Sequence, residues 1–232
     1  MGHFRLRSQA QKDRVGNPSR SLVTLLDPAG ISSEAYRALR TSLLYAAVDV
    51  PPKVLLITSP GSGDGKSTIC ANLAVVLAQA DRETLVIDGD LREPSLHRIF
   101  DVPNVNGVVN VLSGEYNLLE VCGEPFPGLK IISTGPIPPH PAELLSSGRF
   151  SELVGEARRQ FDYVLVDSPP MELVSDSIII AAEADAVLLV VDAEETSKGS
   201  LRKAVRNFEA VGADVLGTVM NKARKAETGS YG

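Results

Sequence analysis

Short apolar runs alternate with amphipathic segments along most of this chain. Apolar runs that predict buried strands lie at 54–57, 84–87, 129–134, 161–167, 186–191 and 215–220. Segments with apolar residues at helical spacing lie at 34–48, 69–80, 175–183 and 198–211. Because strands that alternate with helices form parallel sheets, the pattern predicts an α/β fold: a mainly parallel sheet with helices on both faces.

The remaining segments follow this alternation less clearly. Leu22 to Leu26 could form an edge strand, and Ser32 or Ser33 would cap the helix that follows. Residues 94–128 are mixed, with short helices expected at 94–100 and 107–112 and no motif that the residues define. A helix is expected to begin at Ala142, after a proline-rich loop.

One polar face of the helix at 34–48 carries regularly spaced charges. Glu34, Arg37 and Arg40 follow each other at steps of three, and each step turns only about 60° around a helix axis. All three side chains therefore share one face. Taken alone, this pattern favours a solvated face with one helical ion pair.

A glycine-rich loop joins the strand at 54–57 to the helix at 69–80. Its sequence from Thr58 to Thr68 is T-S-P-G-S-G-D-G-K-S-T. Backbone N–H groups of such a loop crowd around a phosphate, and the helix N-terminus adds partial positive charge. Lys66 would reach the β- and γ-phosphates, and the Ser67 hydroxyl would hold Mg²⁺. The nucleotide-binding residues expected here are Gly61, Ser62, Gly63, Asp64, Gly65, Lys66, Ser67 and Thr68.

The loop departs from the usual spacing at one position. Pro60 stands where the first glycine of the motif is expected, and Gly61 follows it. The alternative is an ordinary glycine-rich turn before a helix, but the strand–loop–helix context favours nucleotide binding.

Polar residues also stand at the ends of other predicted strands. Asp88 and Asp90 end the second strand, Asp167 ends the strand at 161–167, and Asn221 follows the last strand. Ligands of α/β sheets bind at the carboxyl ends of strands. The carboxylates there suggest Mg²⁺ coordination and possible base catalysis, and Asn221 could read a nucleobase edge.

Composition narrows the classes of protein. The net charge of −6 argues against a general nucleic-acid binder. No run of eighteen apolar residues suggests a membrane span, and no apolar segment suggests a signal peptide. The two cysteines, Cys70 and Cys122, form no metal motif, which fits a reducing cytoplasm.

The chain divides into three parts. Residues 1–21 form a basic arm, either solvated and loose or lying near an anionic membrane surface. Residues 22–221 form the α/β domain. Residues 222–232 form a polar tail that is expected to be mobile and contains Tyr231.

Together the motifs resemble the bacterial tyrosine kinases of capsule and exopolysaccharide synthesis, over residues 30–221. Three stretches resemble the family's phosphate and acidic motifs, namely 58–68, 85–92 and 164–170. Residues 34–40 match the E-x2-R-x2-R helix through which these kinases form rings. Residues 138–145 also resemble the family, with His140 where asparagine is usual.

The resemblance implies a P-loop NTPase fold and assigns roles. Lys66 would bind ATP, and Ser67, Asp88 and Asp167 would hold Mg²⁺. Asp88 would take the tyrosine proton, with Asp90 supporting the metal shell, so the implied catalytic residues are Lys66, Asp88, Asp90 and Asp167.

The resemblance also implies partners. Glu34, Arg37 and Arg40 would form a ring interface. A transmembrane activator, either a separate partner or a fused membrane segment, would hold the kinase in the cytoplasm at the inner face of the cell membrane. A neighbouring subunit would phosphorylate Tyr231. The tail departs from the family because it holds one tyrosine instead of a cluster.

Two other functions compete. The first is an ATPase of the partitioning and septum-positioning group, but its signature lysine would stand at the position of Gly61. The second is a non-catalytic, nucleotide-gated scaffold for polysaccharide assembly, which the sparse tail keeps open.

Overall fold

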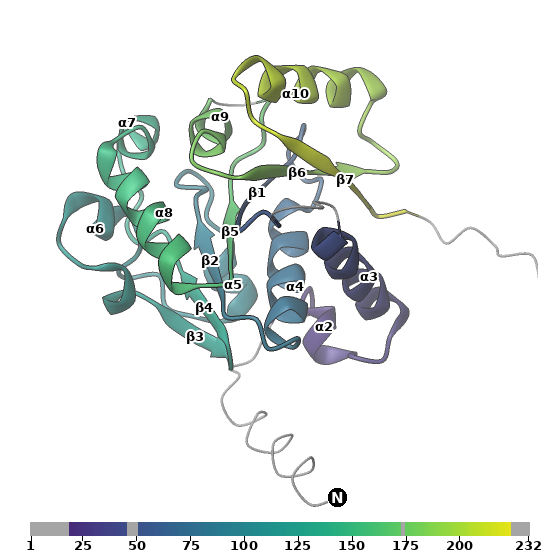
Figure 1. The fold of residues 1–232 in the computed structure, drawn as a ribbon, viewed down its shortest axis with the longest axis horizontal. Coiled ribbons are helices and arrows are strands. Elements are labelled where there is room, and N and C mark those ends of the chain that lie inside the picture. Colours follow the sequence, from purple (N-terminus) through teal and green to yellow (C-terminus); the bar gives the residue numbers. More distant parts are fainter. Residues whose placement is uncertain (1–18, 46–50, 173–174, 224–232) are drawn as a thin grey trace, which may run out of the picture.

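A computed structural model describes residues 19–45, 51–172 and 175–223. These residues form one seven-stranded sheet with helices on both faces (Figure 1). The strand order is β3-β4-β2-β5-β1-β6-β7, and every neighbouring pair is parallel except β3 and β4. The prediction of a mainly parallel α/β sheet is confirmed.

The strands are β1 (Val54–Thr58), β2 (Thr84–Asp88), β3 (Gly123–Phe126), β4 (Leu129–Ile132), β5 (Tyr163–Asp167), β6 (Ala186–Asp192) and β7 (Val215–Asn221). Every residue of β1, β2, β5 and β6 is buried. Because helices cover both faces of these strands, their sequences are continuous apolar runs and do not alternate with polar residues.

The α-helices are α2 (Val23–Leu26), α3 (Ile31–Tyr45), α4 (Lys66–Ala78), α5 (Leu96–Phe100), α6 (Val108–Ser113), α7 (Pro141–Leu145), α8 (Gly148–Gln160), α9 (Asp176–Ala181) and α10 (Lys198–Ala210). A short 3-10 helix lies at Leu118–Glu120. In the described part of the chain, no helix has both the length and the apolar character needed to cross a membrane.

The two faces of the sheet form two separate cores. Leu55 and Ile57 of β1 pack with α2 to α5, whereas Val54 and Leu56 pack with the helices from α6 to α10. The split follows from the strand geometry, since successive side chains point to opposite faces.

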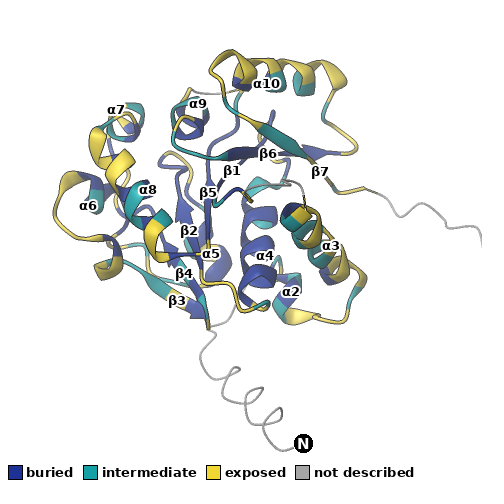
Figure 2. Cartoon of the chain, viewed as in Figure 1, coloured by how far each residue is buried: buried dark blue, intermediate teal, exposed yellow. Residues whose placement is uncertain are grey.

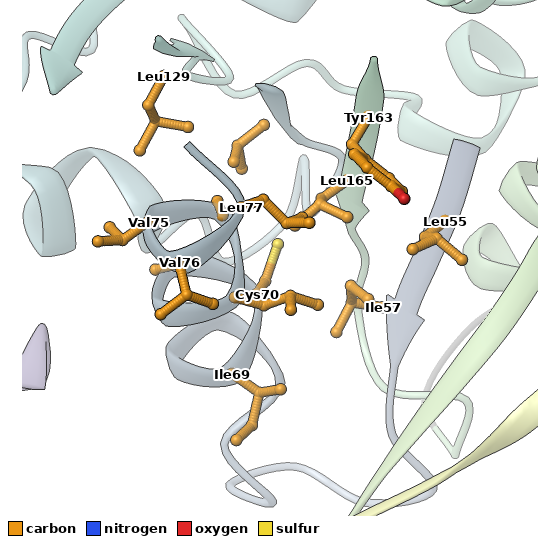
Figure 3. Packing of buried hydrophobic residues seen from close by; sticks show 14 of the residues in the cluster. Leu55, Ile57, Ile69, Cys70, Val75, Val76, Leu77, Leu129, Tyr163 and Leu165 are labelled. Carbon is orange, nitrogen blue, oxygen red and sulfur yellow. The ribbon is translucent and has the colours of Figure 1, made fainter. Parts of the chain in front are cut away.

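Helix α4 lies at the centre of the first core. Figure 3 shows Cys70 and Leu77 on the side that faces β1 and β5, whereas Val76 points away from these strands. All three side chains are fully buried, because α2 and α3 cover the far side of α4 (Figure 2). A helix that is apolar all round is expected in such an enclosed position.

The predicted edge strand at Leu22 to Leu26 is wrong, because this segment forms helix α2. The backbone N–H and the hydroxyl of Thr24 both donate to Oδ1 of Asn72 on α4, at 3.1 and 2.9 Å. These bonds hold the segment against α4, while the edges of the sheet belong to β3 and β7.

The predicted cap of α3 is also wrong. The helix begins at Ile31, so Ser32 and Ser33 lie inside its first turn. The buried Ser33 hydroxyl donates to the carbonyl oxygens of Val23 and Asp27 and thereby joins α3 to α2. The predicted end of this helix near residue 48 lies outside the described residues.

Strand β3, helix α8 and the short 3-10 helix were not predicted. Strand β3 forms an antiparallel hairpin with β4, and its sequence Gly-Glu-Pro-Phe suits only a sheet edge, where proline costs no ladder hydrogen bond. Helix α8 buries Phe150, Leu153, Val154 and Ala157. Elsewhere the predicted bounds differ from the observed ones by a few residues.

Candidate nucleotide-binding site

The carboxyl ends of β2, β5 and β1 meet at one edge of the sheet because these strands are neighbours. The glycine-rich loop leaves β1 there and enters α4 at Lys66. Gly63 and Gly65 have φ values of 83° and 94°. The φ value of Gly65 favours glycine, and a Cβ atom there would lie 2.1 Å from the Asn221 amide nitrogen and displace that side chain.

Lys66 points into a group of carboxylates. Its Nζ atom lies 3.1 Å from Oδ2 of Asp90 and 4.0 Å from Oδ2 of Asp167. Burial alone lowers the pKa of Lys66, but the charges of Asp167 and Asp90 outweigh burial, so the pKa is raised. The ammonium therefore stays charged and is available to phosphate oxygens.

Asp167 and Asp88 are opposite each other on β5 and β2. Ser67 Oγ donates to Oδ2 of Asp167 at 2.5 Å, and the backbone N–H of Leu96 donates to Oδ2 of Asp88 at 3.2 Å. Among the described residues, Oδ1 of Asp88 and Oδ1 of Asp167 are buried without a hydrogen-bond partner.

In the absence of a metal ion, the surroundings of Asp88 and Asp167 disfavour the ionised form of both side chains. Burial is the main cause that raises the pKa of Asp167 to about 6 and the pKa of Asp88 well above its usual value. The charge of Asp167 raises the pKa of Asp88 further. Unpartnered carboxylate oxygens beside a serine hydroxyl are a ligand set that fits Mg²⁺, and the cation would offset both effects.

Asp90 has a different environment from Asp88. Strand β2 ends at Asp88, so Asp90 lies in the loop that follows the strand. Oδ1 of Asp90 accepts the backbone N–H of Glu93 at 3.0 Å, while its Oδ2 faces Lys66. The acid that pairs with Lys66 on this loop is thus Asp90.

An ion pair behind the acidic loop was not predicted. Arg92 Nε and Nη2 donate to Oδ2 and Oδ1 of Asp176 at 2.8 and 3.0 Å, and the Asp176 side chain is fully buried. The pair fastens the loop after β2 to the start of α9. Asp176 resembles an ordinary first-turn acid in the sequence, and 84 residues separate it from its partner.

The Asn221 amide lies against the loop. Its Nδ2 atom donates to the carbonyl oxygen of Asp64 at 2.8 Å. The role of Asn221 in reading a nucleobase stays a prediction.

The charged residues of α3 do not share one environment. Arg37 pairs with Glu34 and donates to the carbonyl oxygen of Pro28 at 2.9 Å. Arg40 instead donates to the carbonyl oxygen of Val76 on α4 at 2.8 Å. Arg40 therefore already serves a contact within its own chain. The basic arm up to residue 18 and the tail with Tyr231 lie outside the described residues.

A parallel sheet whose first strand leads through such a loop into a buried helix, with acids on the neighbouring strand ends, defines the class of P-loop NTPases. The sequence model of the ParA family, described as NUBPL iron-transfer P-loop NTPase, matches residues 51–228.

Similar proteins show to which group of P-loop NTPases the chain is related. Tyrosine-protein kinase YwqD of Bacillus subtilis is 37% identical over 225 residues, which are 96% of this chain and 94% of that protein. Tyrosine-protein kinase wzc of Salmonella typhi is 33% identical over 210 residues, which are 90% of this chain and 29% of that protein. The kinase domain of Escherichia coli tyrosine kinase ETK superposes with a TM-score of 0.84 at 31% identity, covering 100% of this chain and 92% of that structure.

The chain belongs to the bacterial tyrosine-kinase family of P-loop NTPases. The resemblance noted in the sequence is confirmed, and the relatives do not favour the partitioning-type ATPase.

Proposed function

We propose that this protein is an ATP-dependent protein-tyrosine autokinase that regulates capsular or exopolysaccharide synthesis and export. The observation that carries the proposal is the convergence of Lys66, Ser67, Asp88, Asp90 and Asp167 on one edge of the sheet, in a member of a tyrosine-kinase family. The role in polysaccharide synthesis rests on the family resemblance.

ATP and Mg²⁺ are the proposed cofactors. The loop amides and Lys66 bind the phosphate groups, and Ser67, Asp88 and Asp167 hold the metal. The unpartnered oxygens of Asp88 and Asp167 support this assignment. When bound, Mg²⁺ stabilises negative charge on the phosphate oxygens, and the remaining catalysis consists of positioning.

Asp88 is the proposed acceptor of the tyrosine proton. This role depends on the position of the carboxylate more than on its pKa, because phosphoryl transfer relies chiefly on positioning and charge stabilisation. Asp88→Asn should abolish tyrosine phosphorylation yet leave ATP binding within about twofold, because Lys66 and the loop stay in place. Phosphorylation kinetics and isothermal titration measure the two effects, and loss of ATP binding would assign Asp88 a structural role.

The proposed partners follow the family. Subunits form a ring through Glu34, Arg37 and Arg40, and a neighbour phosphorylates Tyr231. A transmembrane activator of the polysaccharide co-polymerase type holds the protein at the inner face of the cell membrane. No nucleic acid takes part.

The test is incubation with labelled ATP and Mg²⁺, with and without cytoplasmic peptides of a candidate membrane partner, followed by mapping of phosphorylated residues by mass spectrometry. We expect phosphate on Tyr231, and none in Lys66→Met. Tyr45 lies at the end of α3 and is 81% exposed. Phosphate on Tyr45 would still support kinase activity but would make Tyr45 the acceptor in place of Tyr231. Release of free phosphate without a modified tyrosine would overturn the proposal in favour of an ATPase switch.

A further inference from the structure

Two consecutive carbonyl groups of the glycine-rich loop are bound from outside by the end of β7. Lys222 Nζ donates to the carbonyl oxygen of Gly63 at 3.0 Å, next to the bond from Asn221 to Asp64. The loop is therefore held on its outer side by two adjacent residues.

Lys222 is itself anchored. Its Nζ atom lies 2.7 Å from Oδ2 of Asp192, the last residue of β6, whose side chain is 3% exposed. The other oxygen of Asp192 accepts the backbone N–H of Glu194 at 2.9 Å. Because β6 and β7 pair with Asp192 opposite Asn221, the ammonium of Lys222 bridges the sheet edge and the loop.

The backbone at Lys222 is held in a disfavoured conformation. Its φ value is 55°, in the left-handed region that side chains other than glycine, asparagine and aspartate rarely adopt. Such conformations persist where surrounding contacts require them, and they concentrate at functional sites. Here the contacts are those of the Lys222 side chain with Asp192 and Gly63.

The geometry of a peptide unit connects these contacts to phosphate binding. In a trans peptide, the C=O of one residue and the N–H of the next point in opposite directions, and this chain has no cis peptide among its described residues. Fixing the Gly63 carbonyl outward thus directs the Asp64 N–H inward. The bond from Asn221 does the same for the N–H of Gly65. Without such contacts, the flexible glycines would let these amides turn away.

We propose that Lys222 is a positioning residue that, anchored by Asp192, holds the Gly63–Asp64 corner of the loop in the conformation that binds nucleotide phosphates. This inference rests on the proposed nucleotide binding and names residues that the loop motif does not contain. Asp64 strengthens the same corner, since its carboxylate accepts the N–H of Gly61 at 2.9 Å and the hydroxyl of Thr196 at 3.1 Å.

The test compares three ligands by isothermal titration: ADP, inorganic pyrophosphate and adenosine. Lys222→Met should lower the affinity for ADP and pyrophosphate by about tenfold and leave the affinity for adenosine unchanged. The reason is that only ADP and pyrophosphate have phosphate groups that bind the loop amides. Lys222→Gly should show the same loss with an unchanged melting temperature, since glycine suits the backbone at this position.

Lys130→Met is the matched control. Lys130 also pairs with a carboxylate, that of Glu124 at 3.4 Å, but lies on β4 away from the loop, so ADP affinity should not change. Asp192→Asn should lower the affinity for ADP less than Lys222→Met does. The double variant should be no weaker than Lys222→Met alone, because the two residues act together.

Wild-type affinity for ADP and pyrophosphate in both Lys222 variants would overturn the inference. An equal loss for adenosine and ADP would also overturn it, because it would place Lys222 at the base. Tyrosine phosphorylation is not measured in this experiment. A protein that binds ADP through Lys222 but modifies no tyrosine would contradict only the proposed kinase activity.

Discussion

The unpartnered oxygens of Asp88 and Asp167 define the site at the scale of single residues. A buried carboxylate without a partner is costly, so both groups favour the protonated form until a cation arrives. The protein alone thus stores unfavourable electrostatic free energy where Mg²⁺ would bind. This cost gives a pH dependence that can be measured.

Without Mg²⁺, the free energy of unfolding should fall as pH rises from about 4 to about 6. The folded protein keeps the proton of Asp167, whose pKa is raised from 3.8 to about 6, whereas the unfolded chain releases it earlier. The folded state therefore binds more protons in this window, and the loss amounts to about 3 kcal/mol for this group. Asp88 changes stability in the same direction.

Urea unfolding at several pH values measures this slope, with Asp167→Asn as the comparison. The variant should flatten the slope and be more stable than the wild type at pH 8, because a buried charge is removed. A wild-type slope in the variant would show that Asp167 is not its source.

At the scale of elements, side chains between neighbouring segments hold the site in place. Arg40 joins α3 to the last turns of α4, and Arg92 joins the acidic loop to α9. These contacts lie beside the proposed ring face and the proposed metal site. Substitutions of the residues in these contacts can therefore change both stability and function, and matched variants are needed to separate the two effects.

Arg37→Ala and Arg40→Ala should both shift the protein toward monomer in sedimentation, but only Arg40→Ala should also lower the free energy of unfolding, by about 1 kcal/mol. The reason is that the bond from Arg40 to the carbonyl oxygen of Val76 is partly buried, whereas the bonds of Arg37 to Glu34 and to the carbonyl oxygen of Pro28 are exposed. An unchanged oligomer in the double variant would discard the ring surface.

Asp176→Ala should lower the free energy of unfolding by about 2–3 kcal/mol, because it leaves Arg92 without the carboxylate it binds through two bonds. The loss of stability should be smaller than for a fully buried ion pair, since the Arg92 side chain is 39% exposed. Glu124→Ala, which breaks the exposed pair with Lys130, is the control and should cost less than about 0.5 kcal/mol. Equal losses would refute the importance of burial here.

At the scale of the whole molecule, the proposed reaction needs two copies of the chain, one with an active site and one with an acceptor. A mixture of Lys66→Met, which keeps Tyr231, and Tyr231→Phe, which keeps the site, should regain phosphorylation on the Lys66→Met chain. Each variant alone should show none on Tyr231. Mass spectrometry of the mixture measures this, and a silent mixture of intact oligomers would exclude transfer between subunits.

Local pattern predicted the parts of the molecule whose structure depends on nearby residues. The loop from Thr58 to Thr68 and the buried strands β1, β2, β5 and β6 follow from apolar runs and glycine spacing. Helix α2 was mistaken for a strand because a short apolar run fits both structures. Helix α8 was missed although Phe150, Leu153, Val154 and Ala157 stand at helical spacing.

Long-range partners could not be predicted in this way. The bonds of Lys222 to Gly63 and of Arg92 to Asp176 span 159 and 84 residues. No periodicity links such positions, because the strand order of the folded sheet brings them together. The sequence thus predicted the residues of the phosphate and acidic motifs, and the structure was needed to show what holds them in place.

The enclosure of α4 decides which parts of the molecule can respond when the bound nucleotide changes. A helix that is buried between the sheet and α2–α3 cannot shift without disturbing both layers. Lys66 and Ser67, at the start of α4, are thus held in fixed positions. We expect any movement that accompanies a change of bound nucleotide to occur in segments outside α4.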